Sequence, residues 1–419
     1  MASLAEERIG GIPGLGIAIG TIEDGVVKRL FSGAADAARA LDSQTVFEIG
    51  SVTKTFTATL LAEMARRGEV ALDNPIEKFL PKAASAPLYN GRHITLVDLA
   101  TQSSGLPTLP TNMKSANAMD PSDYKPELLY AFLSDYKLTR EPGSQYEYSN
   151  LGFGLLGLLL ANRAATSYAT LLSDRILRPL KMESTATGLT RAMDPHLAGG
   201  HDADGGHAPD WFFDALDGAG AIRSSLDDML RYVSANMTPS GSLGEAMKAA
   251  QFPRREATPG ERVGLAWQTD VKSGVVWHNG QTAGYHAFVG MSTDRKRGIV
   301  ILHNAGEDID DIGFHWLYPG RPLKRDYQAL SLDPKLLGRY EGTYGLGPQH
   351  VPYLVTREGG RLFAQLGSQP RFRIYPYAPN RFFYRVVDAQ IDFTVDGNGN
   401  PTGLTLHQNG RDVEATRAN

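Results

Sequence analysis

Strand-like segments stand at both ends of the first domain-sized stretch of the chain, and a long helical region separates them. Residues Ile12–Gly33 read as two apolar strands joined by a turn, and residues 75–270 carry mostly helical spacing with loops rich in Pro and Gly. Strand patterns then return at Val275–Trp277, Ala287–Ser292 and Gly298–His303. We therefore expect an α+β fold, in which one antiparallel sheet is completed by both ends and flanked by helices, with a helical subdomain.

The sequence pattern changes after the last of these strands, and this change predicts a second domain. The segment Pro319–Pro334 reads as a linker, and beyond it short strands alternate with turns such as Glu358-Gly359-Gly360. Short strands at this spacing are typical of a small antiparallel barrel or sandwich. We expect a first domain over residues 1–320 and an all-β barrel over residues 335–419.

Composition narrows the classes of function. Hydrophobic residues make up 42% and charged residues 21% of the 419 residues, a balance typical of a globular protein with a large core. The net charge is -4 with no long run of one sign, so neither nucleic acid nor an anionic membrane is an expected partner. The chain has no cysteine, which excludes disulfides, thiolate metal sites and cysteine nucleophiles.

The N-terminal sequence bears on the cellular compartment of the protein. No stretch reaches about 18 consecutive apolar residues, so we expect no membrane span. The opening residues MASLAEERIGGIPG lack the basic start and apolar run of a signal peptide. We expect a periplasmic or secreted protein if a signal peptide has been removed, and a cytoplasmic protein otherwise.

The clearest chemical signal is the S-x-x-K spacing of Ser51 and Lys54, at the start of a helix predicted over Thr53–Arg67. Residues three apart lie on one face of a helix, so the Lys54 amine can reach the Ser51 hydroxyl. A serine hydroxyl needs a neighbouring base to act as a nucleophile, and a buried lysine serves in its neutral form. An N-capping serine followed by a solvated lysine would leave the same pattern.

A second polar group, Tyr148-Ser149-Asn150, precedes a helix predicted over Leu151–Ala164. A tyrosine close to two cations would hold its phenolate form and take the serine proton. The Asn150 amide would bind a substrate carbonyl and Lys54. The structural alternative is a loop in which Asn150 caps the helix and Tyr148 packs beneath it.

A third group, His278-Asn279-Gly280-Gln281, lies on a late strand. A strand edge beside the nucleophile offers backbone N–H groups, and those of Gln281 and Ser51 are the expected oxyanion donors. Gly280 would let substrate approach the backbone closely.

In this order S-x-x-K, Y-[SA]-N and [KH]-x-G resemble the three motifs of the serine β-lactamase and penicillin-binding-protein superfamily. The chain is most similar to the class C β-lactamase branch, with its D-alanyl-D-alanine carboxypeptidases, D-aminopeptidases and esterases. The resemblance implies that Ser51 is the nucleophile, that Lys54 and Tyr148 share the proton transfers, and that Asn150 and the segment His278–Gln281 bind substrate.

The resemblance also implies a reaction. The chain is expected to be a serine hydrolase that forms an acyl-enzyme and cleaves peptide or amide bonds of D-residue compounds, or β-lactam rings. A carboxylesterase acting on small esters is the alternative, and a binding protein on a retired hydrolase scaffold is a more distant one. Class C β-lactamases usually have lysine at the position of His278. A histidine would be only partly charged near neutrality, so we expect weaker dependence on a substrate carboxylate.

The similarity covers about residues 10–318, and the tail from Leu336 onward resembles the lipocalin-like barrel of some members. We expect a small-molecule or short-peptide substrate and no cofactor or metal, and the sequence leaves homo-oligomerisation open. One Gly-rich loop lacks regular metal-ligand spacing although it carries His201, Asp202, Asp204 and His207. The G-x-G-x-x-G match at Gly152–Gly157 follows no strand, which favours helix packing over dinucleotide binding.

Overall fold

The computed structural model describes residues 1–10, 12–113, 124–324, 327–367, 369, 371–408 and 410–418 of the chain. The chain divides into two compact units, Met1–Pro322 and Leu323–Asn419. The buried apolar clusters of the first unit lie between Ala5 and Leu317, and that of the second between Leu337 and Ala415. Each unit therefore has a core of its own.

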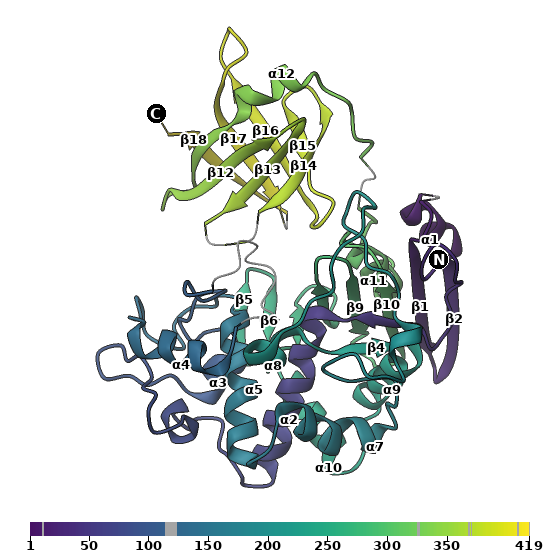
Figure 1. Ribbon diagram of the computed structural model, residues 1–419, viewed down its shortest axis with the longest axis vertical. Helices are drawn as coiled ribbons and strands as arrows, with labels where there is room; N and C mark the ends of the chain where they lie inside the picture. The colour runs from purple at the N-terminus through teal and green to yellow at the C-terminus, as the bar shows by residue number, and fades with distance from the viewer. Residues whose placement is uncertain are drawn as a thin grey trace. The chain divides into compact units, whose positions relative to one another are not determined.

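Within the described residues, an eight-stranded antiparallel sheet forms the frame of the first unit (Figure 1). The first strand, β1, pairs with the last, β10, from Ile17 opposite His303 to Glu23 opposite Arg297. The predicted sheet completed by both ends, and with it the α+β fold, is confirmed. In spatial order the strands are β2 (Val26–Gly33), β1 (Gly16–Glu23), β10 (Arg297–His303), β9 (His286–Met291), β8 (Val276–Gln281), β7 (Gln268–Asp270), β6 (Glu261–Val263) and β5 (Arg255–Thr258).

Four short strands lie inside the region that the sequence pattern assigned mostly to helix. These are β5, β6, β7 and β4 (Arg223–Ser225), and each is three or four residues long. So short a strand shows no hydrophobic alternation, and β4 exists by pairing with the distant β3 (Val46–Glu48). The expectation of a mostly helical middle therefore missed them.

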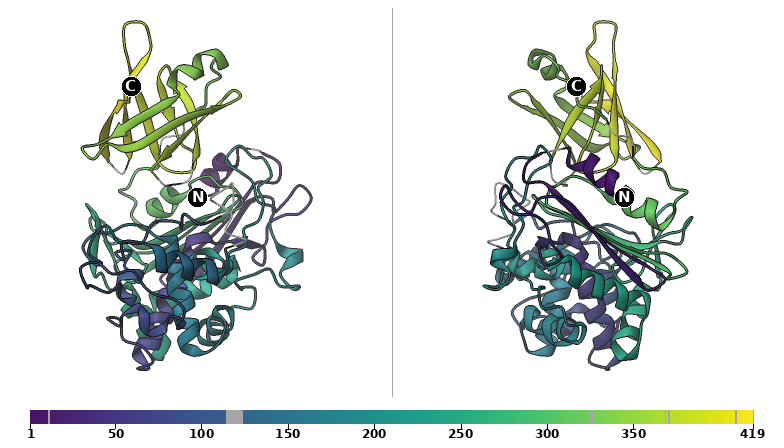
Figure 2. Two further views of the ribbon diagram at one scale, coloured as in Figure 1. Left: turned by 60° about the vertical axis from the view of Figure 1, so that its left-hand side comes forward. Right: turned by 90° about the vertical axis from the view of Figure 1, so that its right-hand side faces the viewer.

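Helices cover both faces of this sheet (Figure 2). One face packs against α1 and α11, and the opposite face against α9. In the described part of the chain no single helix has the length and apolarity to cross a bilayer; α5 and Tyr168–Leu180 pass only as a pair bent by 80°. The helices of the first unit are α1 (Ala2–Ile9), α2 (Thr53–Arg66), α3 (Leu96–Ala100), α4 (Pro126–Asp135), α5 (Asn150–Ala164), α6 (Tyr168–Leu172), α7 (Arg178–Leu180), α8 (Asp217–Gly220), α9 (Leu226–Met237), α10 (Gly241–Gln251) and α11 (Asp310–Leu317).

Helix α2 runs through the core, and every residue from Thr53 to Met64 is buried. Its apolar side chains pack in the main core cluster, while the hydroxyls of its other threonines after Thr53 donate to main-chain carbonyls. Thr55 donates to Val52 O at 2.8 Å and Thr57 to Gly218 O at 2.7 Å. Because a buried hydroxyl without a partner costs free energy, these bonds allow a threonine-rich helix to lie at the centre of the unit.

The second unit is a closed antiparallel barrel, which confirms the predicted barrel over the sandwich. It closes where β11 pairs with β18, through Tyr344 opposite Arg417. Aromatic rings fill its interior: Phe393 contacts Tyr340, Tyr344 and Phe382 at centroid distances of 4.7, 5.7 and 5.5 Å. Its elements are α12 (Pro334–Leu337), β11 (Gly342–Leu346), β12 (Val351–Glu358), β13 (Arg361–Leu366), β14 (Phe372–Ala378), β15 (Arg381–Phe383), β16 (Ala389–Val395), β17 (Pro401–Gln408) and β18 (Arg411–Arg417).

Separate cores predict that the first unit folds without the second. A chain ending at Lys324 keeps every residue of the clusters that surround α2 and the sheet. We expect it to unfold in one cooperative transition in urea and to keep the reactivity of Ser51 toward a serine-directed probe. A shortened chain that folds cooperatively but leaves Ser51 unlabelled would show that the barrel completes the site.

Candidate active site

Ser51 lies where β3 turns into α2. After β3, Gly50 adopts a positive φ of 48°, and a 3₁₀ turn, η1 (Gly50–Val52), continues directly into the helix. A side chain at position 50 would bring its Cβ to 2.7 Å from Gln281 N. Both the left-handed backbone and this close approach require glycine.

The amine of Lys54 lies 2.7 Å from Ser51 Oγ, as the i, i+3 spacing predicted. The same nitrogen donates to Asn150 Oδ1 at 2.7 Å and to Ala219 O at 2.8 Å. Lys54 is fully buried, and burial lowers its pKa well below the ordinary value because the charged form loses its hydration. The alternative of a solvated surface lysine is wrong, and burial favours the neutral amine, which is a base.

Tyr148 donates its phenolic proton to Ser51 Oγ at 2.6 Å. The residue after it, Ser149, caps α5 by accepting the N–H of Gly152 at 2.8 Å. The alternative in which Asn150 caps the helix is therefore wrong, and the Asn150 side chain is instead a partner of the buried amine.

Burial also decides the protonation of Tyr148. It raises the pKa of the phenol above its ordinary value, and the hydrogen bond to Ser51 offsets only part of that rise. A resting phenolate would need two nearby cations, but burial lowers the pKa values of both Lys54 and His278. The expectation that Tyr148 rests as a phenolate is wrong: the resting group is a neutral phenol.

Strand β8 approaches the turn at Ser51 closely at Gly280. A Cβ at this position would lie 2.0 Å from Ile49 O and 2.8 Å from Ser51 N. No side chain fits in that space, so glycine here brings the strand backbone against the backbone of Ser51. The role expected for Gly280 from sequence was contact with substrate; its packing against the turn is a separate reason for glycine.

The N–H of Gln281 points toward the turn that carries Ser51. Across the β8–β9 hairpin Thr282 N donates to Tyr285 O at 3.0 Å. Hydrogen-bonded and non-hydrogen-bonded pairs alternate in an antiparallel ladder, so the adjacent pair, Gln281 and His286, is non-bonded. The Gln281 N–H therefore faces away from β9, toward Gly50.

His278 carries no charge at neutral pH. It is 2% exposed, and burial lowers its pKa to about 3 because the charged imidazolium would lose its hydration. The expectation of a partly charged histidine is wrong, because it used the pKa of a solvated imidazole. Nδ1 lies 2.6 Å from Asn279 O, a carbonyl that only accepts, so Nδ1 bears the proton and Nε2 is an acceptor.

The side chains of Asn279 and Gln281 lie on the other face of β8. Asn279 Nδ2 donates to Asp310 Oδ2 at 2.5 Å, and Gln281 Nε2 donates to Gly306 O at 2.7 Å. Alternate residues of a strand point to opposite faces, so these side chains point away from the face of His278 and Gly280. The Asn279 side chain therefore does not face the side of β8 where it was expected to bind substrate. The Gln281 side chain does not face that side either, so only its backbone N–H is available there.

One cluster of side chains near β8 consists of residue types that can bind a metal ion. The candidate ligand atoms of His286, Asp308 and Asp310 all lie within 4.8 Å of one another. His286 Nε2 lies 2.8 Å from Asp310 Oδ1 and 3.9 Å from Asp308 Oδ1. An imidazole hydrogen-bonded to a carboxylate accounts for this arrangement without an ion.

Sequence reasoning missed the carbonyl of Ala219, which accepts a hydrogen bond from Lys54. A main-chain carbonyl leaves no side-chain signal in a sequence. The only available sign was the run Gly218-Ala219-Gly220, whose glycines allow close packing: a Cβ on Gly218 would lie 2.7 Å from Phe153 O.

Comparisons with known proteins agree with this geometry. Residues 1–317 match the family model described as Beta-lactamase, and residues 328–417 match Domain of unknown function (DUF3471). Penicillin-binding protein 4* of Bacillus subtilis (strain 168) is 25% identical over 417 residues, covering 90% of this chain and 89% of the relative. D-alanyl-D-alanine-carboxypeptidase/endopeptidase AmpH of Escherichia coli (strain K12) is 31% identical over 281 residues, covering 62% and 71%.

Solved structures share the fold. A class C β-lactamase superposes with a TM-score of 0.66 at 21% identity, covering 78% of this chain and 95% of the other. The β-lactamase/D-alanine carboxypeptidase of Yersinia pestis gives 0.63 at 23% identity, covering 73% and 91%. The chain is thus an enzyme of the serine hydrolase class. It belongs to the Beta-lactamase family.

The lowered pKa of His278 predicts a pH dependence of stability. The unfolded chain binds a proton at this histidine near its ordinary value of 6.5, whereas the folded chain binds it only near 3. The free energy of unfolding should therefore fall as pH drops from about 6.5 toward 3, by at most about 1.4 kcal/mol per pH unit from this residue. His278→Asn should remove that slope in urea titrations, whereas His93→Asn, at an exposed histidine, should not. Equal slopes in wild type and His278→Asn would contradict the prediction.

Proposed function

We propose that this hydrolase cleaves an amide, peptide or β-lactam carbonyl through an acyl-enzyme on Ser51. One observation carries the proposal: Ser51 Oγ lies 2.7 Å from a buried lysine amine and 2.6 Å from the Tyr148 phenol. A serine hydroxyl with a base and an acid both in hydrogen-bond reach is equipped for nucleophilic attack and for protonation of a leaving group.

The proton path follows from the partners of Lys54. A neutral amine has two N–H donors and one lone pair. The N–H groups are used by Asn150 Oδ1 and Ala219 O, which leaves the lone pair for the Ser51 proton. When Ser51 Oγ attacks the carbonyl carbon, its proton moves to Lys54, and the new ammonium still has three oxygen partners.

The remaining steps use the backbone donors and the phenol. The carbonyl oxygen becomes negative on attack and is held by the N–H groups of Ser51 and Gln281. Tyr148 gives its proton to the departing nitrogen and recovers one from the Lys54 ammonium. Lys54 then takes a proton from water as the water oxygen attacks the ester carbon. The bond between that carbon and Ser51 Oγ breaks, and Ser51 Oγ takes the proton back from Lys54. The products are a carboxylic acid, an amine and the starting enzyme.

The neutral His278 supports a substrate class. Its Nε2 is an acceptor without charge, so it favours an N–H or O–H donor of the substrate and gives a free carboxylate no ion pair. We infer that D-residue amides or peptides, or other neutral acyl compounds, suit the site better than carboxylate-bearing β-lactams. Small esters are the second candidate, because an ester needs the same nucleophile and oxyanion donors but less help with its leaving group.

Removing the nucleophile tests the proposal directly. Ser51→Ala should abolish turnover of D-amino acid amides and p-nitrophenyl esters, and should abolish the mass increase that a fluorophosphonate adds to the intact protein. The substitution deletes one oxygen, so circular dichroism and the urea midpoint should stay close to those of wild type. Near wild-type turnover in this variant would refute the proposal, and a wild type without label or turnover would favour a binding protein.

Charge at position 278 tests the substrate class. The comparison is the ratio of kcat/KM for a carboxylate-bearing substrate to that for its amide-capped analogue. His278→Lys should raise the ratio by about tenfold, or about 1.4 kcal/mol of transition-state binding, whereas His278→Gln should leave it near wild type. In wild type the ratio should be flat between pH 5 and pH 8, because His278 stays neutral in that range. A ratio that His278→Lys does not change would show that this position does not read substrate charge.

A further inference from the structure

Gln102 accepts the backbone N–H groups of both residues that flank Tyr148. Its main-chain oxygen accepts the N–H of Glu147 at 2.6 Å, and its side-chain Oε1 accepts the N–H of Ser149 at 2.8 Å. An N–H only donates, so the atom facing Ser149 must be the amide oxygen. A single residue, 46 positions earlier in the chain, therefore brackets the tyrosine that contacts the nucleophile.

The surroundings hold Gln102 firmly. It is 3% exposed and adopts a positive φ of 56°, a left-handed conformation that non-glycine residues seldom take. Its own N–H donates to Leu99 O at 3.2 Å, just after α3. Such a conformation persists only where the fold supports it, so Gln102 is a fixed support for the loop.

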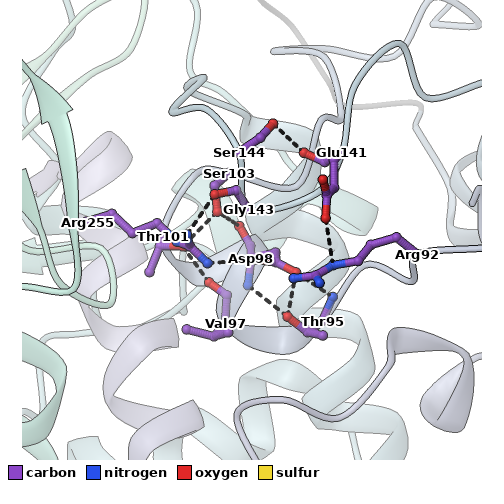
Figure 3. Close-up of polar contacts among 10 residues, drawn as sticks. All are labelled: Arg92, Thr95, Val97, Asp98, Thr101, Ser103, Glu141, Gly143, Ser144 and Arg255. Atoms are coloured by element: carbon purple, nitrogen blue, oxygen red, sulfur yellow. Dashed lines mark hydrogen bonds and ion pairs between the residues drawn. The ribbon is translucent and has the colours of Figure 1, made fainter. Parts of the chain in front are cut away.

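The same segment also anchors the start of that loop. Figure 3 shows Arg255 of β5 donating to Gly143 O at 2.7 Å and to the buried Asp98 at 3.1 Å. Gly143 N donates in turn to Ser103 O at 2.7 Å. The beginning of the loop is thus held by an ion pair and main-chain bonds, whereas the N–H directly after Tyr148 is held by the Gln102 side chain.

We propose that Gln102 is a positioning residue that aligns the Tyr148 phenol for protonation of the leaving group. This inference rests on the proposed function, in which Tyr148 gives that proton. Losing the Oε1 acceptor frees the peptide after Tyr148 and lets the phenol move. Attack by Ser51 depends on Lys54, which lies on α2 and not on the tyrosine loop, so the loss falls on leaving-group protonation rather than on attack.

This division predicts a dependence on the leaving group. An anilide nitrogen must be protonated as it departs, whereas p-nitrophenolate leaves as a stable anion. Gln102→Met, which removes the acceptor at similar size, should lower kcat for a p-nitroanilide by about tenfold. With the p-nitrophenyl ester of the same acyl group the change should be less than about twofold, and KM should change little for both.

Matched variants separate positioning from general damage. Gln102→Asn tolerates the left-handed backbone but is one methylene too short, so it should behave like Gln102→Met. Gln102→Glu keeps an oxygen at full length and should restore most of the anilide rate. Gln251→Met, at a buried glutamine that bonds to Asn236, should leave the anilide-to-ester ratio unchanged. Adding Gln102→Met to Tyr148→Phe should cost little beyond Tyr148→Phe alone, because both act on one proton transfer.

Each result decides between positioning and structure. Equal losses with anilide and ester, no rescue by Gln102→Glu, or losses that multiply with Tyr148→Phe would overturn the inference while leaving acylation of Ser51 intact. If Tyr148→Phe itself spares the anilide, or wild type is not acylated at Ser51, the proposed function fails and this inference falls with it. If Gln102→Met does not fold, Gln102→Asn gives the same comparison.

Discussion

The buried amine of Lys54 sets the condition that the rest of the site meets. An ammonium removed from water is costly unless it is neutralised or fully hydrogen-bonded. Its oxygen partners come from three separate segments: Ser51 at the start of α2, Asn150 at the start of α5 and Ala219 in α8. Displacing any one of these segments would leave the buried amine without one of its three hydrogen-bond partners. The same packing that buries α2 in the core therefore also assembles the site around Lys54.

Two close supports then place the groups around Ser51. Strand β8 reaches the turn because positions 50 and 280 carry no side chain, and this brings the Gln281 N–H close to the turn at Ser51. The tyrosine loop reaches Ser51 as well, and there the N–H groups of Glu147 and Ser149, on either side of Tyr148, donate to Gln102. The first support depends on the missing side chains of Gly50 and Gly280, and the second on the buried hydrogen bonds of Gln102. Both fix the position of main-chain atoms, which move less than side chains.

In the resting site, burial favours the uncharged forms of Lys54, Tyr148 and His278. In the proposed reaction, charge then appears only as the reaction proceeds, on Lys54 and on the carbonyl oxygen of the substrate. Preorganised donors that meet charge as it develops stabilise a transition state more than a ground state. The neutral His278 fits this pattern, because it adds no fixed charge that a substrate would have to match.

The sequence by itself determined the local parts of this protein. Strand patterns at both ends gave the sheet, the i, i+3 spacing gave the contact of Ser51 with Lys54, and three ordered motifs pointed to the family. The short strands β4 to β7, the outward direction of Asn279, the carbonyl of Ala219 and the two bonds of Gln102 came only with tertiary structure. The protonation states of Lys54, Tyr148 and His278 also came only with tertiary structure. A pKa depends on burial, and burial is decided by segments far apart in the chain. A residue's type and spacing state what it is able to do; which atoms surround it, and therefore which charge it carries, is settled by the fold.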